Sequence, residues 1–259
     1  MNNTLTLITG DALKLPIPDN SVDLIITHPP YMGIDTKRYG GEESNQINSN
    51  PKKMIKLLRK MTAEAFRVLK PGGHMIICNG PGMLTDIRYV IDISDKSNLA
   101  YVDKVVVNSY ATMGREDNQH INEKTTEMIM SELVSTWYHF LKPGVAFSDP
   151  FKVKKYNNPV WDIRFNNMDD PIDKKLFKDG HFVLDAMNRE VPKRFIEMFS
   201  KRGDVVLDPF GGSAVVGTTA LTLGRSAISN DISEEQLKIA ELRAKMMFGE
   251  KFESSVIRL

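Results

Sequence analysis

The sequence has a single cysteine, Cys78, among its 259 residues. One cysteine excludes an internal disulfide and a multi-cysteine zinc site, and such scarcity is typical of a reducing compartment. Nowhere do about 18 apolar residues follow one another as a membrane span requires, and the first four residues lack the basic start and apolar run of a secretion signal. We therefore expect a cytoplasmic protein without a membrane span.

An excess of charge of one sign is also missing, because 34 basic and 33 acidic residues give a formal net charge of +1. This balance predicts no global attraction to nucleic acid, although a local basic face could still supply it. Hydrophobic residues make up 41% of the chain, which is enough for one large core. Composition therefore excludes a disordered chain and a small disulfide scaffold, and indicates one domain over residues 1–259.

The N-terminal part alternates strands with a helix. Three short apolar runs bounded by turn residues predict buried strands, at residues 4–9, 22–27 and 74–78. A helix is expected over residues 51–69, because Pro51 suits a first helical turn and a Pro-Gly-Gly sequence follows the last one. Strand, helix and strand together form a βαβ unit.

The C-terminal third repeats this alternation. Strands are expected at residues 205–207 and 226–229, and helices at about 192–200, 214–223 and 234–247. Alternating strands and helices at both ends predict an α/β fold, a Rossmann-like doubly wound sheet that is mostly parallel and covered on both faces.

The middle of the chain, residues 109–180, lacks clear alternation and carries polar runs. We expect one helix near residues 127–141, because a Lys-Pro-Gly sequence follows it. We interpret residues 109–180 as an insert or lid embedded in the domain.

A glycine-rich segment follows the strand at residues 205–207. Its glycines permit positive φ and a close approach of a ligand to the backbone, while the start of the next helix favours an anionic group. Asp231 lies 20 residues beyond Gly211, at the end of the next strand, where an acidic side chain can bind ribose hydroxyls. These features together predict a site for an adenosine-bearing cofactor.

Other nucleotide sites fit this segment less well. The glycines fall at Gly211, Gly212 and Gly217, which does not match the G-x-G-x-x-G fingerprint of NAD or FAD sites. A P-loop would need a Gly-Lys-Ser or Gly-Lys-Thr sequence, which is missing. The glycines alone fit a tight βα turn equally well, and their combination with Asp208 and Asp231 favours a binding site.

The second motif is His28-Pro29-Pro30-Tyr31, directly after the strand at residues 22–27. The prolines fix φ, remove two amide donors and leave carbonyl acceptors, while Tyr31 offers a rigid face for a planar base. Taken alone, such a tetrapeptide is more often a strand-ending turn with its aromatic residue in the core.

Together the two motifs resemble the amino-methylating DNA methyltransferases, whose signature is Asp, Asn or Ser followed by Pro-Pro-Tyr or Pro-Pro-Phe. Similar segments are Gly10-Asp11-Ala12, residues 20–26, residues 208–213, Gly224-Arg225 and Asp231-Ile232-Ser233. The similarity covers about residues 4–80 and 185–245. The catalytic motif precedes the cofactor motif, which resembles the permuted order of the β group.

This resemblance implies S-adenosylmethionine as the cofactor. Asp231 would hold its ribose and Asp11 its adenine end, and residues 185–195 resemble a further cofactor-contacting stretch. The methionine end would contact the segment Asp208, Pro209, Phe210, Gly211, Gly212 and Ser213. No metal is implied, and the five scattered histidines show no ligand spacing.

The implied reaction is direct methyl transfer to an exocyclic amine of a flipped DNA base, held against Tyr31. His28 and the Pro29 carbonyl would accept hydrogen bonds from the amine and orient its lone pair. His28 departs from the family's Asp, Asn or Ser, and only a neutral histidine offers an acceptor. Ala214 replaces the usual glycine, a change that we expect a helix start to tolerate. We expect Cys78 to be a buried strand residue and not a nucleophile.

The target base is less strongly indicated. Residues 32–40 contain a Tyr-Gly pair and resemble the Ser-Pro-Pro-Tyr cytosine-N4 enzymes more than the adenine-N6 enzymes. This similarity favours cytosine N4. The alternatives are an RNA or protein-glutamine methyltransferase, and a cofactor-binding homologue that His28 has made inactive.

DNA is the expected partner, in a restriction-modification or related system, with residues 109–180 as a candidate target-recognition region. One candidate contact surface is basic: Lys52, Lys53, Lys56, Arg59, Lys60, Arg67 and Lys70. Such a run is more often a solvated helix face. Another candidate surface comprises Lys152, Lys154, Lys155, Tyr156 and Trp161. The DNA-binding surface could be completed by a second copy of the chain, in a homodimer, or by a separate specificity subunit.

Overall fold

A computed structural model describes residues 3–30, 51–79, 87–108, 134–144, 156, 158–163, 170–181, 187–249 and 256–258. Its strands are β1 (Leu5–Thr9), β2 (Val22–Thr27), β3 (Leu69–Asn79), β4 (Ala100–Asn108), β5 (Val134–Leu141), β6 (Val160–Asp162), β7 (Val205–Asp208), β8 (Ser226–Asp231) and β9 (Val256–Arg258). Its helices are α1 (Pro51–Val68), α2 (Ile87–Ser97), α4 (Pro171–Lys178), α5 (Glu190–Phe199), α6 (Val215–Thr222) and α7 (Glu234–Phe248).

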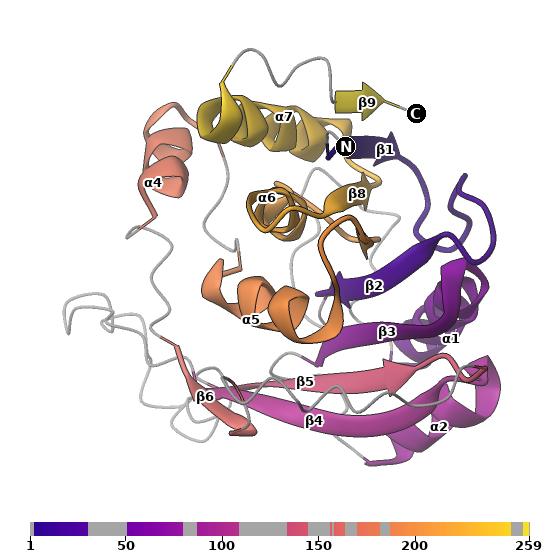
Figure 1. The fold of residues 1–259 in the computed structure, drawn as a ribbon. Helices are drawn as coiled ribbons and strands as arrows, with labels where there is room; N and C mark the ends of the chain where they lie inside the picture. Colours follow the sequence, from indigo (N-terminus) through magenta and orange to yellow (C-terminus); the bar gives the residue numbers. More distant parts are fainter. Residues whose placement is uncertain are drawn as a thin grey trace.

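The described strands form one sheet in the order β6-β4-β5-β3-β2-β7-β8-β1-β9 (Figure 1). Strand β5 runs antiparallel to β3 and to β4, and every other described pairing is parallel. The expected mostly parallel, doubly wound sheet is therefore confirmed.

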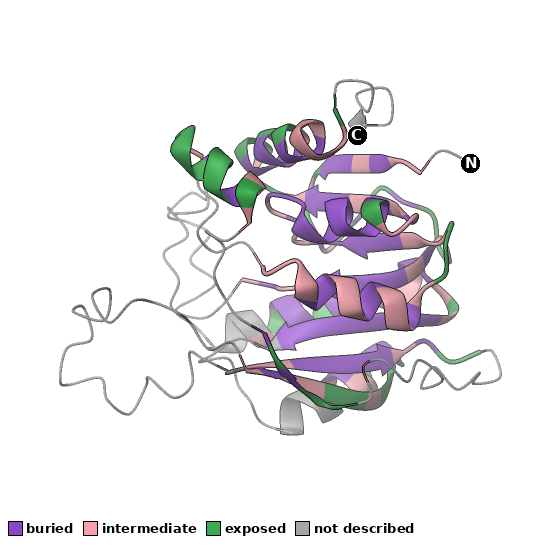
Figure 2. Ribbon diagram, turned by 60° about the vertical axis from the view of Figure 1, so that its left-hand side comes forward, coloured by how far each residue is buried: buried purple, intermediate pink, exposed green. Residues whose placement is uncertain are grey.

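Helices cover both faces of this sheet. Strand β2 alternates its side chains between the two layers: Leu24 packs in the core that contains Phe195 of α5 and Val216 of α6, whereas Ile25 packs in the core that contains Leu58 of α1. The central strands β1, β2 and β7 are consequently buried along most of their length, whereas β4 and β6 at one edge are mostly exposed or half-buried (Figure 2). Parallel sheets require this double cover, because each strand has two faces to shield from water.

Most expected elements are present, including the helix near residues 51–69 and the strands and helices of the C-terminal third. The helix expected near residues 127–141 is wrong over its described part, because Val134–Leu141 is strand β5. Trp137 packs in one core, and Tyr138 and Phe140 pack in the other. A strand that is buried on both faces is apolar without alternation, so its sequence pattern does not distinguish it from a buried helix.

The segment interpreted as an insert, residues 109–180, contributes β5 to the interior of the sheet and β6 to its edge. It also contains α4, which packs against α7 through a small apolar cluster that includes Leu176 and Ile239. Most of the remaining segment lies outside the described residues, and its role as a lid or target-recognition region stays a prediction. No helix in the described part of the chain is long and apolar enough to cross a membrane.

Two histidine side chains face each other on the side of the sheet that α5 covers. His74 Nδ1 of β3 and His139 Nε2 of β5 are 2.9 Å apart, and the His139 ring lies 4.3 Å from the Phe199 ring, centroid to centroid. Burial lowers the pKa of His74 to about 4. Burial, with a smaller contribution from His74, lowers the pKa of His139 to about 3. Both rings are therefore neutral at pH 7.

We expect the free energy of unfolding to fall as the pH drops from 7 to 5. In the unfolded chain these histidines take up protons near pH 6.5, whereas in the folded protein they stay neutral. Each ring therefore lowers the free energy of unfolding by about 2 kcal/mol between pH 7 and 5. Urea unfolding at pH 7, 6 and 5 measures this slope. A double variant, His74→Gln with His139→Gln, should remove the part of this slope that the pair causes and leave the parts caused by buried His28 and Asp208. An unchanged slope would show that the pair does not control acid stability.

Candidate active site at the carboxyl edge of the sheet

Two turns leave the sheet side by side. The proline turn, His28-Pro29-Pro30, follows β2, and the glycine turn, residues 209–214, follows β7. Strands β2 and β7 are parallel neighbours, with Leu24 beside Val206, so both turns emerge at the carboxyl edge of the sheet. Adjacent strand ends of this kind form the usual ligand crevice of doubly wound sheets.

Two further motif segments reach the same edge. Strand β1 pairs in parallel with β8, with Thr9 beside Asp231, and β8 pairs with β7. Gly10 and Asp11, which follow β1, therefore emerge near Asp231. The structure thus brings the proline turn, the glycine turn, Asp231 and the Gly10-Asp11 segment to four adjacent strand ends. Gly224-Arg225 precedes β8 and lies at the opposite edge of the sheet.

A buried hydrogen bond connects the two turns. The Thr27 hydroxyl donates to Asp208 Oδ1 at 2.9 Å, across 181 residues of sequence. The Phe210 amide donates to the same oxygen at 3.1 Å. Asp208 is 4% exposed, and burial raises its pKa to about 7. Its observed contacts support the turns from within the protein, and a direct contact with the cofactor stays a prediction.

His28 packs against an aromatic wall. Its ring lies 5.8 Å from the Trp137 ring of β5, centroid to centroid. Burial lowers the pKa of His28 to about 4, so the ring is neutral at pH 7. The expected role as a hydrogen-bond acceptor requires a neutral ring, and desolvation in the folded protein keeps the ring neutral. Tyr31 lies outside the described residues, so its expected stacking role stays a prediction.

The glycine turn needs its glycines for two different reasons. A Cβ on Gly211 would lie 2.9 Å from Ser229 Cβ, which is too close for any side chain. Gly212 has φ +49°, in the left-handed region. Ala214 also adopts this region, with φ 58° and ψ 41°. A non-glycine residue there costs about 1–2 kcal/mol, so the change from the family's glycine is tolerated with strain.

Asp231 binds the glycine turn from the end of β8. Its Oδ2 accepts a hydrogen bond from the Gly212 amide at 2.9 Å, and its Oδ1 accepts one from the Ser233 amide at 2.9 Å. Burial raises the pKa of this carboxyl group. Each carboxylate oxygen has a further lone pair, so Asp231 can still accept ribose hydroxyls.

Asn230 was missed by the sequence reasoning. Its Nδ2 donates to the carbonyls of Gly10 at 3.0 Å and Pro209 at 2.9 Å, so it bridges the segments that follow β1 and β7. An amide side chain at the end of a strand, directly before Asp231, was the available signal. Asp11 is exposed and accepts a hydrogen bond from the Leu13 amide at 2.9 Å. Its expected role at the adenine end stays a prediction.

The basic helix is less available for DNA than its sequence indicates. Arg59 forms two 2.6 Å hydrogen bonds with Asp92 of α2. Lys70 pairs with Asp23 at 2.7 Å. Arg67 is also held, by carboxylates at positions 19 and 64 and by two backbone carbonyls. These three cations are therefore engaged in ion pairs within the fold, whereas no ion pair of Lys56 or Lys60 is seen among the described residues, and both are exposed.

The alternative aromatic surface is also packed. Trp161 is buried, and the Arg194 guanidinium lies 5.3 Å from the centroid of its ring and 5.3 Å from that of Tyr156. Trp161 is therefore not available for DNA. The three lysines of that surface lie outside the described residues. Cys78 is buried in β3, as expected.

The family model for DNA methylases of the N6/N4 type matches residues 22–242. The chain belongs to this family. The resemblance found in the sequence is therefore confirmed at the level of the family, and the roles of its individual residues stay predictions.

Named relatives of this DNA methylase include a type II methyltransferase and a DNA adenine methyltransferase. M.HpaI of Haemophilus parainfluenzae, a type II methyltransferase, is 29% identical over 94% of this chain and 75% of its own length. The DNA adenine methyltransferase YhdJ of Escherichia coli strain K12 is 28% identical over 92% of this chain and 82% of its own length.

Solved structures share the fold of the DNA methylase. The PvuII cytosine-N4-specific DNA methyltransferase superposes with a TM-score of 0.72 at 19% identity, over 99% of this chain and 95% of that one. The DNA modification methylase TTHA0409 of Thermus thermophilus, in complex with S-adenosyl-L-methionine, gives 0.65 at 21% identity, over 98% of this chain and 99% of that one.

We expect Thr27→Val to destabilise the DNA methylase by about 1–3 kcal/mol, because it leaves buried Asp208 without one hydrogen-bond donor. Thr27→Ser is the matched control, since it keeps the hydroxyl group. Urea unfolding followed by circular dichroism compares the two variants. Wild-type stability of Thr27→Val would show that this hydrogen bond does not stabilise the fold.

Proposed function

We propose that this DNA methylase transfers the methyl group of S-adenosylmethionine to an exocyclic amine of a base in DNA, with cytosine N4 favoured over adenine N6. The observation that carries the proposal is the buried Thr27 to Asp208 hydrogen bond, which holds the proline turn beside the glycine turn. Methyl transfer requires the amine and the cofactor to be held close together, and two adjacent turns can hold them so. Type II methyltransferase relatives favour a role in restriction-modification or a related system.

The residues along the carboxyl edge fit the cofactor. Gly211 and Gly212 present bare backbone, and Asp231 offers carboxylate lone pairs suited to ribose hydroxyls. When bound, S-adenosylmethionine supplies an electrophilic methyl group on a positively charged sulfur. In the proposed complex, Asp231 orients the ribose, and residues 208–213 position the methionine end.

The proline turn positions the target amine. Pro29 has no amide donor, and its carbonyl is an acceptor for one amine hydrogen. His28, kept neutral by burial, is proposed to accept the other. With both hydrogens directed toward these acceptors, the nitrogen lone pair is oriented toward the methyl group. The pKa of about 4 makes His28 a weak base, so its proposed role is orientation and not proton storage.

Duplex DNA and RNA incubated with methyl-labelled S-adenosylmethionine, then digested to nucleosides, test this function. We expect the label in N4-methylcytosine from DNA. Label in N6-methyladenine would reassign the base and keep the reaction class. Label in RNA alone would contradict a DNA substrate, and cofactor binding without any transfer would support the inactive homologue.

An ordinary histidine would lose acceptor capacity as the pH falls through about 6.5, but burial lowers the pKa of His28 and moves this loss to about pH 4. We therefore expect methyl transfer to depend little on the His28 charge between about pH 8 and 5.5. His28→Asn should retain activity because it keeps an acceptor, whereas His28→Ala should lose about tenfold or more, equivalent to ~1.4 kcal/mol.

Initial rates of methyl incorporation over this pH range, with folding checked by circular dichroism, test the role of His28. A wild-type rate that falls through about pH 6.5 while His28→Asn stays flat would show that His28 protonates in this range. Equal rates for wild type and His28→Ala would show that the Pro29 carbonyl suffices.

A further inference from the structure

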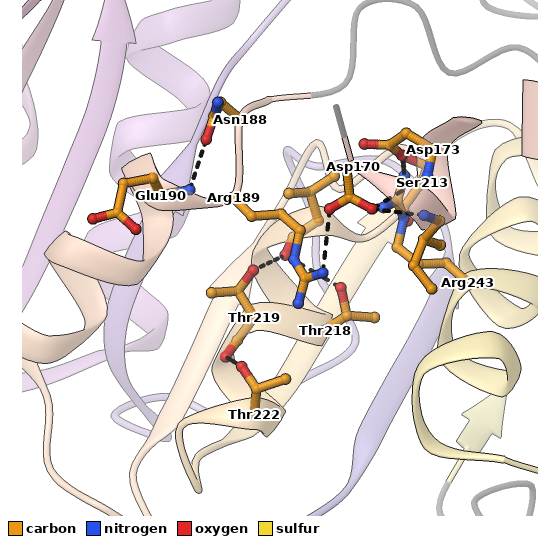
Figure 3. Close-up of polar contacts among 12 residues, drawn as sticks. Asp170, Asp173, Asn188, Arg189, Glu190, Ser213, Thr218, Thr219, Thr222 and Arg243 are labelled. Carbon is orange, nitrogen blue, oxygen red and sulfur yellow. Dashed lines mark hydrogen bonds and ion pairs between the residues drawn. The ribbon is translucent and has the colours of Figure 1, made fainter. Parts of the chain in front are cut away.

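A buried ion pair, Arg243 with Asp173, lies beneath the glycine turn and belongs to neither the proline motif nor the glycine motif. Arg243 of α7 is 0% exposed, and its Nε donates to the Ser213 carbonyl at 2.8 Å. Its Nη2 also donates to Ser213 Oγ at 3.2 Å and pairs with Asp173 Oδ1 of α4. Figure 3 shows the three side chains converging from α7, α4 and the turn. Arg243 thus holds Ser213 by both its main chain and its side chain.

The turn that Arg243 holds is conformationally strained. Gly212 and Ala214, on either side of Ser213, both adopt positive φ. An alanine in this region is unfavourable, so the turn needs contacts from the surrounding structure to keep its shape. The two hydrogen bonds from Arg243 are such contacts.

Packing alone does not account for this pair. Burying a guanidinium and a carboxylate is costly, and apolar residues of similar size often stabilise a fold equally well. Asp173 is 1% exposed, and burial raises its pKa even though Arg243 opposes the shift. An apolar replacement would preserve packing and lose the hold on Ser213. The hydrogen bonds to Ser213 are therefore what the ion pair provides and an apolar pair would not.

Helix α4 also contacts the second segment expected to meet the cofactor. Asp170 caps α4 by accepting from the Ile172 amide at 2.8 Å, and it pairs with Arg189 at 3.2 Å. Arg189 is the N-cap residue of α5, within residues 185–195. Helix α4 therefore braces the glycine turn through Asp173 and the start of α5 through Asp170 (Figure 3).

We propose that Arg243 and Asp173 are positioning residues that fix the glycine turn in its cofactor-binding shape before the cofactor arrives. The inference rests on the proposed function, because it assumes S-adenosylmethionine as the ligand. Arg243 acts through Ser213, since a side chain with no exposed surface does not reach a ligand in the crevice. A turn fixed in advance loses less conformational entropy on binding, so loosening it weakens affinity.

The decisive variant is Asp173→Leu combined with Arg243→Met, which replaces the ion pair with apolar side chains and leaves no unpaired buried charge. Calorimetric titration with S-adenosylmethionine should give a Kd about tenfold higher than that of the wild type, which corresponds to ~1.4 kcal/mol. The melting temperature should fall only slightly, because the packing is kept while the Ser213 carbonyl and hydroxyl lose their Arg243 donor. In kinetics, KM for the cofactor should rise while kcat at saturating cofactor changes little.

A second variant and a control complete the experiment. Arg243→Lys keeps the buried charge opposite Asp173 but lacks the guanidinium fork that reaches both oxygens of Ser213, so its Kd should also rise. Lys175→Ala removes an exposed ion pair on the same helix, with Asp179, and should leave the Kd unchanged. If the double variant does not fold, Arg243→Lys decides the question.

The outcomes separate the two proposals. A wild-type protein that does not bind S-adenosylmethionine would overturn the proposed function and this inference with it. Binding by the wild type with an unchanged Kd in the folded double variant would overturn the positioning role alone. A raised Kd in Lys175→Ala equal to that of Arg243→Lys would also overturn it, because the effect would then belong to α4 in general.

Discussion

The parallel pairing of β2 with β7 is the constraint on which the rest of the site depends. These strands lie far apart in sequence, yet their register aligns Leu24 with Val206 and Ile25 with Leu207. The proline turn and the glycine turn therefore leave the sheet as neighbours. The Thr27 to Asp208 hydrogen bond then fixes their relative position, because a buried carboxylate without donors would destabilise the fold.

Buried polar groups hold each part of this edge in place. Asp208 connects the two turns, Asn230 bridges the segments after β1 and β7, and Asp231 accepts from the Gly212 amide. Asn230 Oδ1 is buried with no hydrogen-bond partner among the described residues. The two carboxylates and Asn230 Nδ2 bond largely to backbone groups, so movement of one segment would leave a polar group unpaired. These hydrogen bonds therefore fix the shape of the carboxyl edge without a ligand.

The antiparallel strand β5 connects the middle of the chain to the same edge. It runs between β3 and β4, and its Trp137 packs against both His28 and Phe195 of α5. The aromatic wall that desolvates His28 therefore comes from a segment that carries no recognisable motif. Helix α4, from the same segment, braces the glycine turn through the Asp173–Arg243 ion pair. The middle segment is thus part of the site's support, whatever its role toward DNA.

The sequence by itself determined the alternation of strands and helices, the two motifs and the family, because these depend on local patterns of apolar residues, prolines and glycines. It did not determine β5, since a strand buried on both faces has no alternation to reveal it. It also did not indicate that Arg59, Arg67 and Lys70 are bound to carboxylates, because partners distant in sequence satisfy them. Only the tertiary structure lowered the pKa of His28 and placed Arg243 beneath Ser213. Desolvation and long-range hydrogen bonding arise from neighbours that the folded chain brings together, so no local pattern specifies them.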